Sequence, residues 1–269
     1  GNMHRFDLSS TSTGSWGTTN IFTAKYLSAS SSPQPITTKP VVIRNPDFPD
    51  DFIVNFATGS WFTTSDGTST DIQSVYGIWD TMASNTSIDK SDLVEQTLTN
   101  VVDTTFGNIR TLTDTSVTYA NGNTTDKGWF IDLDIPAAGS TSGVEFPGER
   151  AIRNLQIRGD YIFINTVIPQ DSTSCVPAAG GFEMAFNPLT GGSGSDPIFD
   201  FNNDGTFNNS DNLSNNNVVV GRRFDGSVPS DSTFIGNRRY TQLSDKSIVS
   251  IETNTGSGLT TGRVSWKEL

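Results

Sequence analysis

The sequence predicts an all-β fold of the β-propeller type, and three observations lead to this prediction. Short apolar runs are separated by turn-forming residues about every ten residues, as in sandwiches, barrels and propellers. Aromatic residues make up 10% of the 269 residues although hydrophobic residues make up only 33%, which suits many short strands that each bury one or two large side chains. Glycine-opened strands ending in Asp or Asn recur at 1–7, 128–132 and 181–187, and repeated units of this kind favour propeller blades.

Taken in order, the apolar runs place the expected strands at 3–8, 41–43, 52–56, 73–79, 117–119, 128–133, 155–157, 161–168, 182–186, 218–220, 248–251 and 263–266. Alternation in 73–79 indicates a strand directly. Prolines at 33, 35 and 40 exclude a central strand between them, because proline cannot donate to a sheet ladder. Segment 87–98 leans towards a helix and can equally be a strand.

Composition and charge exclude several classes of partner. Only 17% of the residues are charged, yet the net charge is -12 with a pI of about 4.4, so the chain should repel nucleic-acid phosphates and anionic membranes. No apolar run is long enough to insert into a membrane. The single cysteine, Cys175, excludes an internal disulfide and a zinc cluster. Because the chain begins inside an apparent strand, we expect it to be a piece of a longer protein.

The clearest chemical signal lies at 200–211, which reads D-F-N-N-D-G-T-F-N-N-S-D. Oxygen-bearing groups fall at the spacing of an EF-hand-type calcium loop, in which a glycine at position six allows the sharp turn. The expected ligands of Ca²⁺ are the side chains, and for Thr206 the backbone carbonyl, of Asp200, Asn202, Asp204, Thr206, Asn208 and Asp211. Calcium prefers six or more oxygen ligands, which this set can supply.

This loop differs from an EF-hand in two ways. Position twelve is Asp211 rather than Glu, so its arm is shorter, and the flanks at 195–199 and 218–221 suggest strands rather than helices. The alternative interpretation is a solvated turn without metal, since Asn, Asp and Gly favour turns on their own.

Other segments carry weaker signals. Arg158, Gly159 and Asp160 form an Arg-Gly-Asp tripeptide; it suggests either an integrin-type recognition turn or simply a tight turn between two strands. His4 is the only histidine and is expected to be an ordinary strand residue. The acids at 132 and 134, and those at 47, 50 and 51, are expected at the surface, with ion binding as the alternative. The arginine pairs at 222–223 and 238–239 either neutralise the acidic surface or contact another domain.

With these segments in place, the sequence resembles the C-terminal β-propeller domain of the PilY1/PilC family, the tip-associated adhesins of type IV pili. The resemblance extends over nearly the whole chain. It rests on G-N with R-F-D-L at 1–8, P-I-T-T-K-P-V at 35–41, Q-S-V-Y-G-I-W-D at 73–80, G-W at 128–129, G-E-R at 148–150, I-P at 168–169, Cys175 with G-G at 180–181, and G-R-V-S-W at 262–266.

The resemblance implies that 1–269 is one C-terminal domain, a modified β-propeller with long loops or a fragment of one, and that the N-terminal part of the protein is absent. It also implies export through the periplasm and outer membrane to the cell surface, at the pilus tip. Pilus subunits, minor pilins and a host-cell receptor or extracellular matrix are the implied partners. Family members carry a calcium loop whose occupancy is linked to pilus extension and retraction; it matches Asp200, Asn202, Asp204 and Asn208, where Asn replaces Asp twice.

The expected function is therefore a calcium-binding propeller of a pilus-tip adhesin and pilus biogenesis factor, and not an enzyme. The first alternative is an enzyme on a propeller scaffold, of quinoprotein or glycosidase type, but no cluster of catalytic groups supports it. The second is a purely structural surface subunit. Binding to host cells separates an adhesin from that subunit, and converging acids or arginines at the propeller axis would indicate the enzyme.

Overall fold

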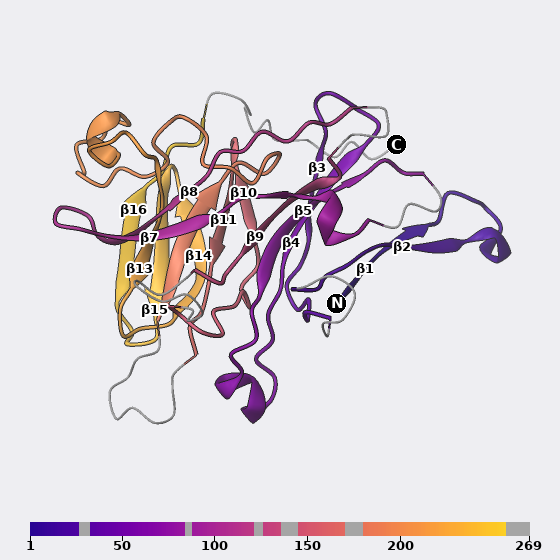
Figure 1. The fold of residues 1–269 in the computed structure, drawn as a ribbon, viewed down its shortest axis with the longest axis horizontal. Helices are drawn as coiled ribbons and strands as arrows, with labels where there is room; N and C mark the ends of the chain where they lie inside the picture. Colours follow the sequence, from indigo (N-terminus) through magenta and orange to yellow (C-terminus); the bar gives the residue numbers. More distant parts are fainter. Residues whose placement is uncertain (27–32, 84–87, 121–125, 136–144, 170–179, 257–269) are drawn as a thin grey trace.

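The computed structural model describes residues 1–26, 33–83, 88–120, 126–135, 145–169 and 180–256 (Figure 1). Within these ranges the chain forms sixteen β-strands and four 3-10 helices, with no α-helix. The strands make four separate sheets rather than one closed ring. The all-β prediction is confirmed, and the open sheets agree with a modified propeller. None of the described helices has the length and apolar character needed to cross a membrane.

The five-stranded sheet has the order β3-β4-β5-β9-β6. All neighbours are antiparallel except β6 and β9, which are parallel. The segment predicted most directly becomes β5, in the middle of this sheet. Every residue of β5 is buried, because both faces of the strand are covered. The bounds are β3 (Val41–Arg44), β4 (Phe52–Ala57), β5 (Ser74–Asp80), β6 (Val94–Glu95) and β9 (Gly128–Asp132).

The six-stranded sheet has the order β10-β11-β12-β13-β8-β7 and is antiparallel throughout. Its first four strands come from the second half of the chain, whereas β7 and β8 come from the first half. The pairing of β13 with β8 therefore joins the two halves in one sheet. The bounds are β7 (Leu98–Asp103), β8 (Gly107–Leu112), β10 (Gln156–Arg158), β11 (Tyr161–Asn165), β12 (Gly181–Phe186) and β13 (Val219–Phe224).

Two smaller sheets complete the fold. The hairpin of β1 (Asn2–Asp7) and β2 (Gly17–Thr23) extends from one end of the molecule (Figure 1). The three-stranded sheet contains β14 (Pro229–Ile235), β15 (Arg238–Leu243) and β16 (Ile248–Glu252). The 3-10 helices cover η1 (Thr13–Ser15), η2 (Thr64–Thr68), η3 (Lys90–Asp92) and η4 (Asn209–Asp211).

The apolar core has two main clusters, which lie on opposite faces of the five-stranded sheet. One face packs against the six-stranded sheet, where the Trp129 ring meets Phe186 edge-on at 5.6 Å between centroids. The other face packs against the hairpin, where Phe22 lies 5.0 Å from Tyr76. Aromatic pairs at these separations add to the stability that burial already provides. Many of the aromatic side chains of the sequence therefore lie in the contacts between sheets.

The structure corrects several sequence expectations. No strand forms at 117–119. Of the segment 87–98, the described residues 88–98 form η3, β6 and the start of β7, which agrees with the strand alternative and not with an α-helix. Strands β2, β7, β8, β14 and β15 were not predicted, since each contains several polar residues and gains its regularity from pairing. The segment before the loop at 200–211 is not a strand but makes a single bridge from Phe199 to Thr253. Residues 263–266 lie outside the described residues.

Candidate metal loop

The loop at 200–211 starts at the edge of the three-stranded sheet. The Asp200 amide donates to the Glu252 carbonyl at 3.0 Å, and Phe199 bridges Thr253 in antiparallel fashion. The loop ends in η4, after which the chain enters β13 of the six-stranded sheet. Asp200 is 4% exposed and Asp211 is 1% exposed, so the two ends are anchored while the middle lies in solvent. The loop therefore connects two sheets.

The first half of the loop is curled around the Asp200 carboxylate. Its oxygens accept from the amides of Asp204 at 3.2 Å and Gly205 at 2.9 Å. Gly205 has a φ of 78°, in the left-handed region that glycine adopts without steric cost. The turn that the sequence predicted at position six is present.

The side chains at positions three and five meet beside this turn. The Asp204 amide also donates to Asn202 Oδ1 at 2.9 Å, and Asn202 Nδ2 donates to Asp204 Oδ2 at 3.0 Å. Asp204 Oδ1 accepts from the Thr206 hydroxyl at 2.6 Å and from the Thr206 amide at 2.8 Å. These hydrogen bonds, with the hydroxyl contributing most, lower the pKa of Asp204, because they stabilise the carboxylate.

The second half of the loop is organised by Asp211. One carboxylate oxygen accepts from the Phe201 amide at 2.9 Å, and the other accepts from the Asn208 amide at 3.1 Å. Asn208 caps η4 by accepting from the Ser210 amide at 2.8 Å, and it donates to the Thr206 hydroxyl at 2.7 Å. Asp211 thus closes the loop onto its own start, as a capping box does at a helix end.

The residues fit a calcium ion in their chemistry. All the candidate calcium ligands are oxygen atoms of Asp side chains, Asn side chains or a backbone carbonyl, and hard cations prefer oxygen ligands. Asp200, Asn202 and Asp204 already converge, because the first two accept from the backbone amide of the third. No three His, Cys, Asp or Glu side chains of the described residues are grouped as a metal centre would hold them. An ion here would depend on amide and backbone oxygens as well as on carboxylates.

The Arg-Gly-Asp tripeptide forms the tight turn between β10 and β11, with Arg158 paired to Tyr161. Gly159 has a φ of 59° and is buried. A β-carbon at this glycine would lie 1.7 Å from the Thr255 carbonyl, and the Asp160 amide donates to the same carbonyl at 2.9 Å. Recognition of this tripeptide by an integrin would need an exposed turn. The contacts with Thr255 instead favour the interpretation as a packed turn between two strands.

One of the acids expected at the surface, Asp132, makes a nearly buried ion pair instead. Lys90 Nζ lies 2.7 and 2.8 Å from the two oxygens of Asp132, and both side chains are nearly buried. Burial raises the pKa of Asp132, which Lys90 opposes. Asp134 accepts from the Tyr26 hydroxyl at 2.7 Å. The expectation of a solvated surface was therefore wrong for Asp132, whereas Asp134 is half-buried, and Asp47 and Asp50 are exposed as expected.

The arginine pairs divide between surface and interior. Arg222 and Arg239 both bind Glu183 inside the molecule, whereas Arg223 and Arg238 pair with exposed or half-exposed acids. Arg110 binds Glu149 through two hydrogen bonds at 2.6 Å. The buried positions of Glu183 and Glu149 were not predicted from the sequence. Only the G-E-R segment signalled one of them. His4 lies exposed on β1, and Cys175 lies outside the described residues.

Comparisons with known proteins agree with this fold and these motifs. The family model described as the PilY1 beta-propeller domain matches residues 1–110. A type IV pilus biogenesis factor PilY1 homolog of Xylella fastidiosa (strain Temecula1) is 30% identical over 272 residues, which cover 100% of this chain and 20% of that protein. The type IV pilus biogenesis factor PilY1 of Pseudomonas aeruginosa (strain PAO1) is 29% identical over 203 residues, covering 70% of this chain and 17% of that protein.

A solved structure shares the fold. The crystal structure of the Pseudomonas aeruginosa PilY1 C-terminal domain superposes with a TM-score of 0.71 at 22% identity, over 91% of this chain and 50% of that chain. The chain spans about a fifth of the length of the curated relatives named above. The family model, the relatives and the shared fold agree with the motifs of the sequence, and the chain belongs to the PilY1 family.

Proposed function

We propose that this chain is the calcium-binding C-terminal propeller domain of a type IV pilus biogenesis factor that acts as an adhesin at the pilus tip. The relatives are named pilus biogenesis factors, which supports a role in the pilus rather than an enzymatic one. The observation that carries the calcium part is the curled loop in which the side chains of Asp200 and Asn202 both accept from the backbone amide of Asp204.

The role of the ion in this proposal is structural. The loop holds three carboxylates, and a divalent cation would offset the repulsion between them. Its first residue is hydrogen-bonded to Glu252, the last residue of β16, and its last turn leads towards β13. Ordering of the loop would therefore strengthen the connection between the three-stranded and six-stranded sheets. In the complete protein, that change would modulate pilus function and adhesion.

Isothermal titration calorimetry with calcium chloride tests the metal site. Asp204→Asn removes a charged ligand whose side chain contacts only loop residues, so we expect binding to weaken about tenfold or more. Asp245→Asn is the matched control, because Asp245 accepts from the amide and hydroxyl of Ser247 as Asp204 does from Thr206. Absence of calcium binding by the wild type at millimolar concentrations would refute the site.

The pilus role is tested separately in cells. Deletion of the whole gene should reduce pilus assembly, the full-length protein should restore it, and the full-length Asp204→Asn variant should restore it with altered calcium dependence. Unchanged piliation after deletion would overturn the biogenesis role. Binding of the purified protein to host cells or extracellular matrix distinguishes an adhesin from a structural subunit of the surface assembly, since the latter would show none.

A further inference from the structure

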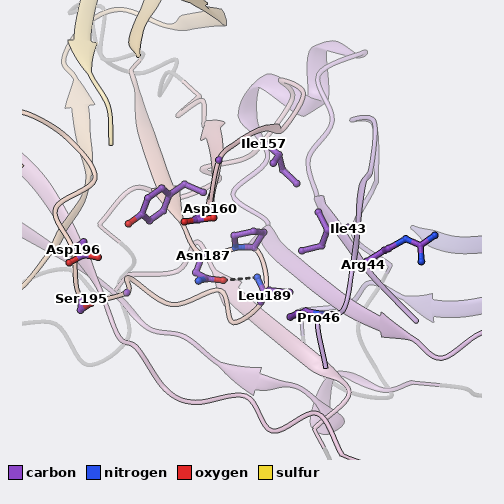
Figure 2. Close-up of a pocket in the computed structure, with 13 residues that line it drawn as sticks. Ile43, Arg44, Pro46, Ile157, Asp160, Asn187, Leu189, Ser195 and Asp196 are labelled. Atoms are coloured by element: carbon purple, nitrogen blue, oxygen red, sulfur yellow. Dashed lines mark hydrogen bonds between the residues drawn. The ribbon is translucent and has the colours of Figure 1, made fainter. Parts of the chain in front are cut away.

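A cavity of about 660 Å³ lies between the five-stranded and six-stranded sheets, apart from the metal loop. Its walls come from the end of β3, from the β10–β11 turn and from the loop at 187–196 (Figure 2). That loop is held in shape by Asn187, whose side chain accepts from the Leu189 amide at 2.8 Å and whose backbone bonds to Gly191 and Gly192. Hydrogen bonds within the loop therefore fix the shape of this wall of the cavity.

The interior of the cavity is mainly apolar, and it borders two sheet edges. Ile43 and Ile157 face it, together with Pro188 and Leu189. Ile43 belongs to β3 and Ile157 to β10, and each of these strands is the outermost strand of its sheet. An outermost strand has free main-chain groups on one side, which an extended peptide can pair with. Apolar pockets beside such edges hold alternate side chains of a peptide.

Two carboxylates, Asp160 and Asp196, line the same cavity. In the part of the chain that the structure describes, neither has a basic partner within ion-pair distance. Arg44 also belongs to the lining, but its guanidinium donates to the Pro49 carbonyl at 2.8 Å and points away from both acids (Figure 2). Among the described residues, the cavity thus presents negative charge without a basic partner beside apolar surface.

The two carboxylates also affect the pKa of the buried Tyr161, which lines the same cavity. Burial, with smaller contributions from Asp196 and then Asp160, raises the pKa of the Tyr161 hydroxyl to about 12. A neighbouring negative charge opposes ionisation of a phenol, so the shift agrees with a negative potential inside the cavity. A cation entering this space would meet favourable electrostatics before making any contact.

We propose that this cavity binds an extended segment of a partner protein in which an apolar residue is followed by Lys or Arg. The apolar side chain packs on Ile43, Ile157 and Leu189, and the basic side chain reaches Asp160 and Asp196. Main-chain groups of the segment pair with the free edge of β3 or β10. Charge complementarity selects the basic segment, and the two free edges select an extended peptide over a small amine.

The probe for the test is a blocked tetrapeptide of sequence Ile-Lys-Val-Lys, titrated into the full chain and followed by calorimetry. We expect saturable binding that weakens as sodium chloride is raised. The Asp160→Asn/Asp196→Asn variant should bind about tenfold more weakly or worse, since both replacements keep the side-chain shape and remove the charge. Asp47→Asn/Asp50→Asn is the matched control, because these exposed acids change the net charge equally and do not line the cavity.

Each result decides the proposal. Wild-type affinity in the control variant together with a loss in the cavity variant supports it. Equal binding of an Ile-Glu-Val-Glu peptide, an unchanged affinity in the cavity variant, or no binding at millimolar peptide would overturn it. Equal binding of n-butylammonium would show a small-amine site and also overturn the peptide assignment. The far-ultraviolet circular dichroism of both variants should match the wild type, as the replaced carboxylates make no ion pair.

Discussion

Glu183 and Arg239 form an ion pair that joins β12 of the six-stranded sheet to β15 of the three-stranded sheet. Both side chains are almost completely buried, at 0% and 2% exposure. Glu183 also accepts from Arg222 Nε at 3.0 Å and from the Thr241 hydroxyl at 3.2 Å. Removing one partner of a buried ion pair leaves an uncompensated charge in a low dielectric. The resulting loss of folding free energy is larger than the net stabilisation that the pair provides.

We therefore expect Glu183→Gln to lower the free energy of unfolding by about 3–5 kcal/mol. Denaturation in urea, followed by circular dichroism, measures this change. Glu252→Gln is the matched control, because Glu252 pairs with Arg238 while both side chains remain about a third exposed; it should cost less than about 1 kcal/mol. Similar losses in the two variants would contradict the assignment of a structural role to the buried pair.

A second prediction concerns Gly77, where the central strand β5 passes the Trp129 ring. A β-carbon at this glycine would lie 2.2 Å from Trp129 Nε1, and Trp129 is completely buried and donates to the Pro188 carbonyl at 3.2 Å. Gly77→Ala should therefore destabilise the protein by about 1–3 kcal/mol or more through overpacking.

Gly17 provides the comparison for this substitution. It lies exposed in β2 with nothing within 4 Å of an added β-carbon. Gly17→Ala should change the free energy of unfolding by less than about 0.5 kcal/mol, as surface substitutions usually do. Thermal unfolding of both variants gives the answer, and a Gly77→Ala protein as stable as the wild type would show that the Trp129 ring can move aside without cost.

A third prediction concerns acid stability at Asp66, which caps η2. The amides of Thr63 and Phe62, followed by the Ser60 hydroxyl, lower its pKa to about 2. A carboxylate with a lowered folded-state pKa contributes stability that is present above its unfolded pKa of about 4 and is lost as the pH falls towards the folded value. The melting temperature of Asp66→Asn should lie below that of the wild type at pH 7, and the gap should close by about pH 2.

The difference between the two proteins, measured across pH 7 to 2, isolates Asp66 from the other carboxylates that titrate in both. A gap that stays constant over this range would mean that the ionised carboxylate adds no stability beyond the amide of the variant.

A fourth prediction concerns the two amides in the metal loop. Asn202→Asp/Asn208→Asp would supply two further carboxylates at ligand positions. Calcium affinity depends on the number of charged ligands, so the variant should bind calcium about tenfold more tightly than the wild type, which corresponds to about 1.4 kcal/mol. In the absence of calcium it should be less stable, because five carboxylates would then repel one another.

Calorimetry measures the affinity, and melting with and without a chelator measures the stability. Asn215→Asp/Asn217→Asp adds the same charge to the neighbouring Asn-rich turn, outside the ligand set, and should leave the affinity unchanged. Equal gains in both variants would show a general charge effect rather than coordination by Asn202 and Asn208.

Much of the fold could be predicted from local pattern. The apolar runs at 41–43, 52–56 and 182–186 lie within strands, and 73–79 does so from residue 74 on, because β-branched and aromatic residues between turn signals have few other stable conformations. The curled start of the loop at 200–211 was also predictable, since Gly205 and the alternating Asp and Asn side chains organise their own backbone.

A buried arginine and several polar strands could not be predicted from the local sequence pattern. Strand β8 carries Arg110, a residue whose charge argues for a surface position, yet it is fully buried because Glu149 and the Phe182 ring surround its guanidinium. Strands β14 and β15 are rich in polar residues and become regular by pairing with each other. Their partners are not encoded in their own composition.

The sequence alone thus determined the all-β class, the position of the apolar strands and the spacing of the candidate calcium ligands, because each depends on residues close together in the chain. The tertiary structure decided which strands pair and which charges are buried. It joined β13 to β8, placed Glu183 between Arg222 and Arg239, and brought Asp160 and Asp196 to one cavity. These relationships depend on contacts between segments far apart in sequence, where the free energy of packing outweighs local preference.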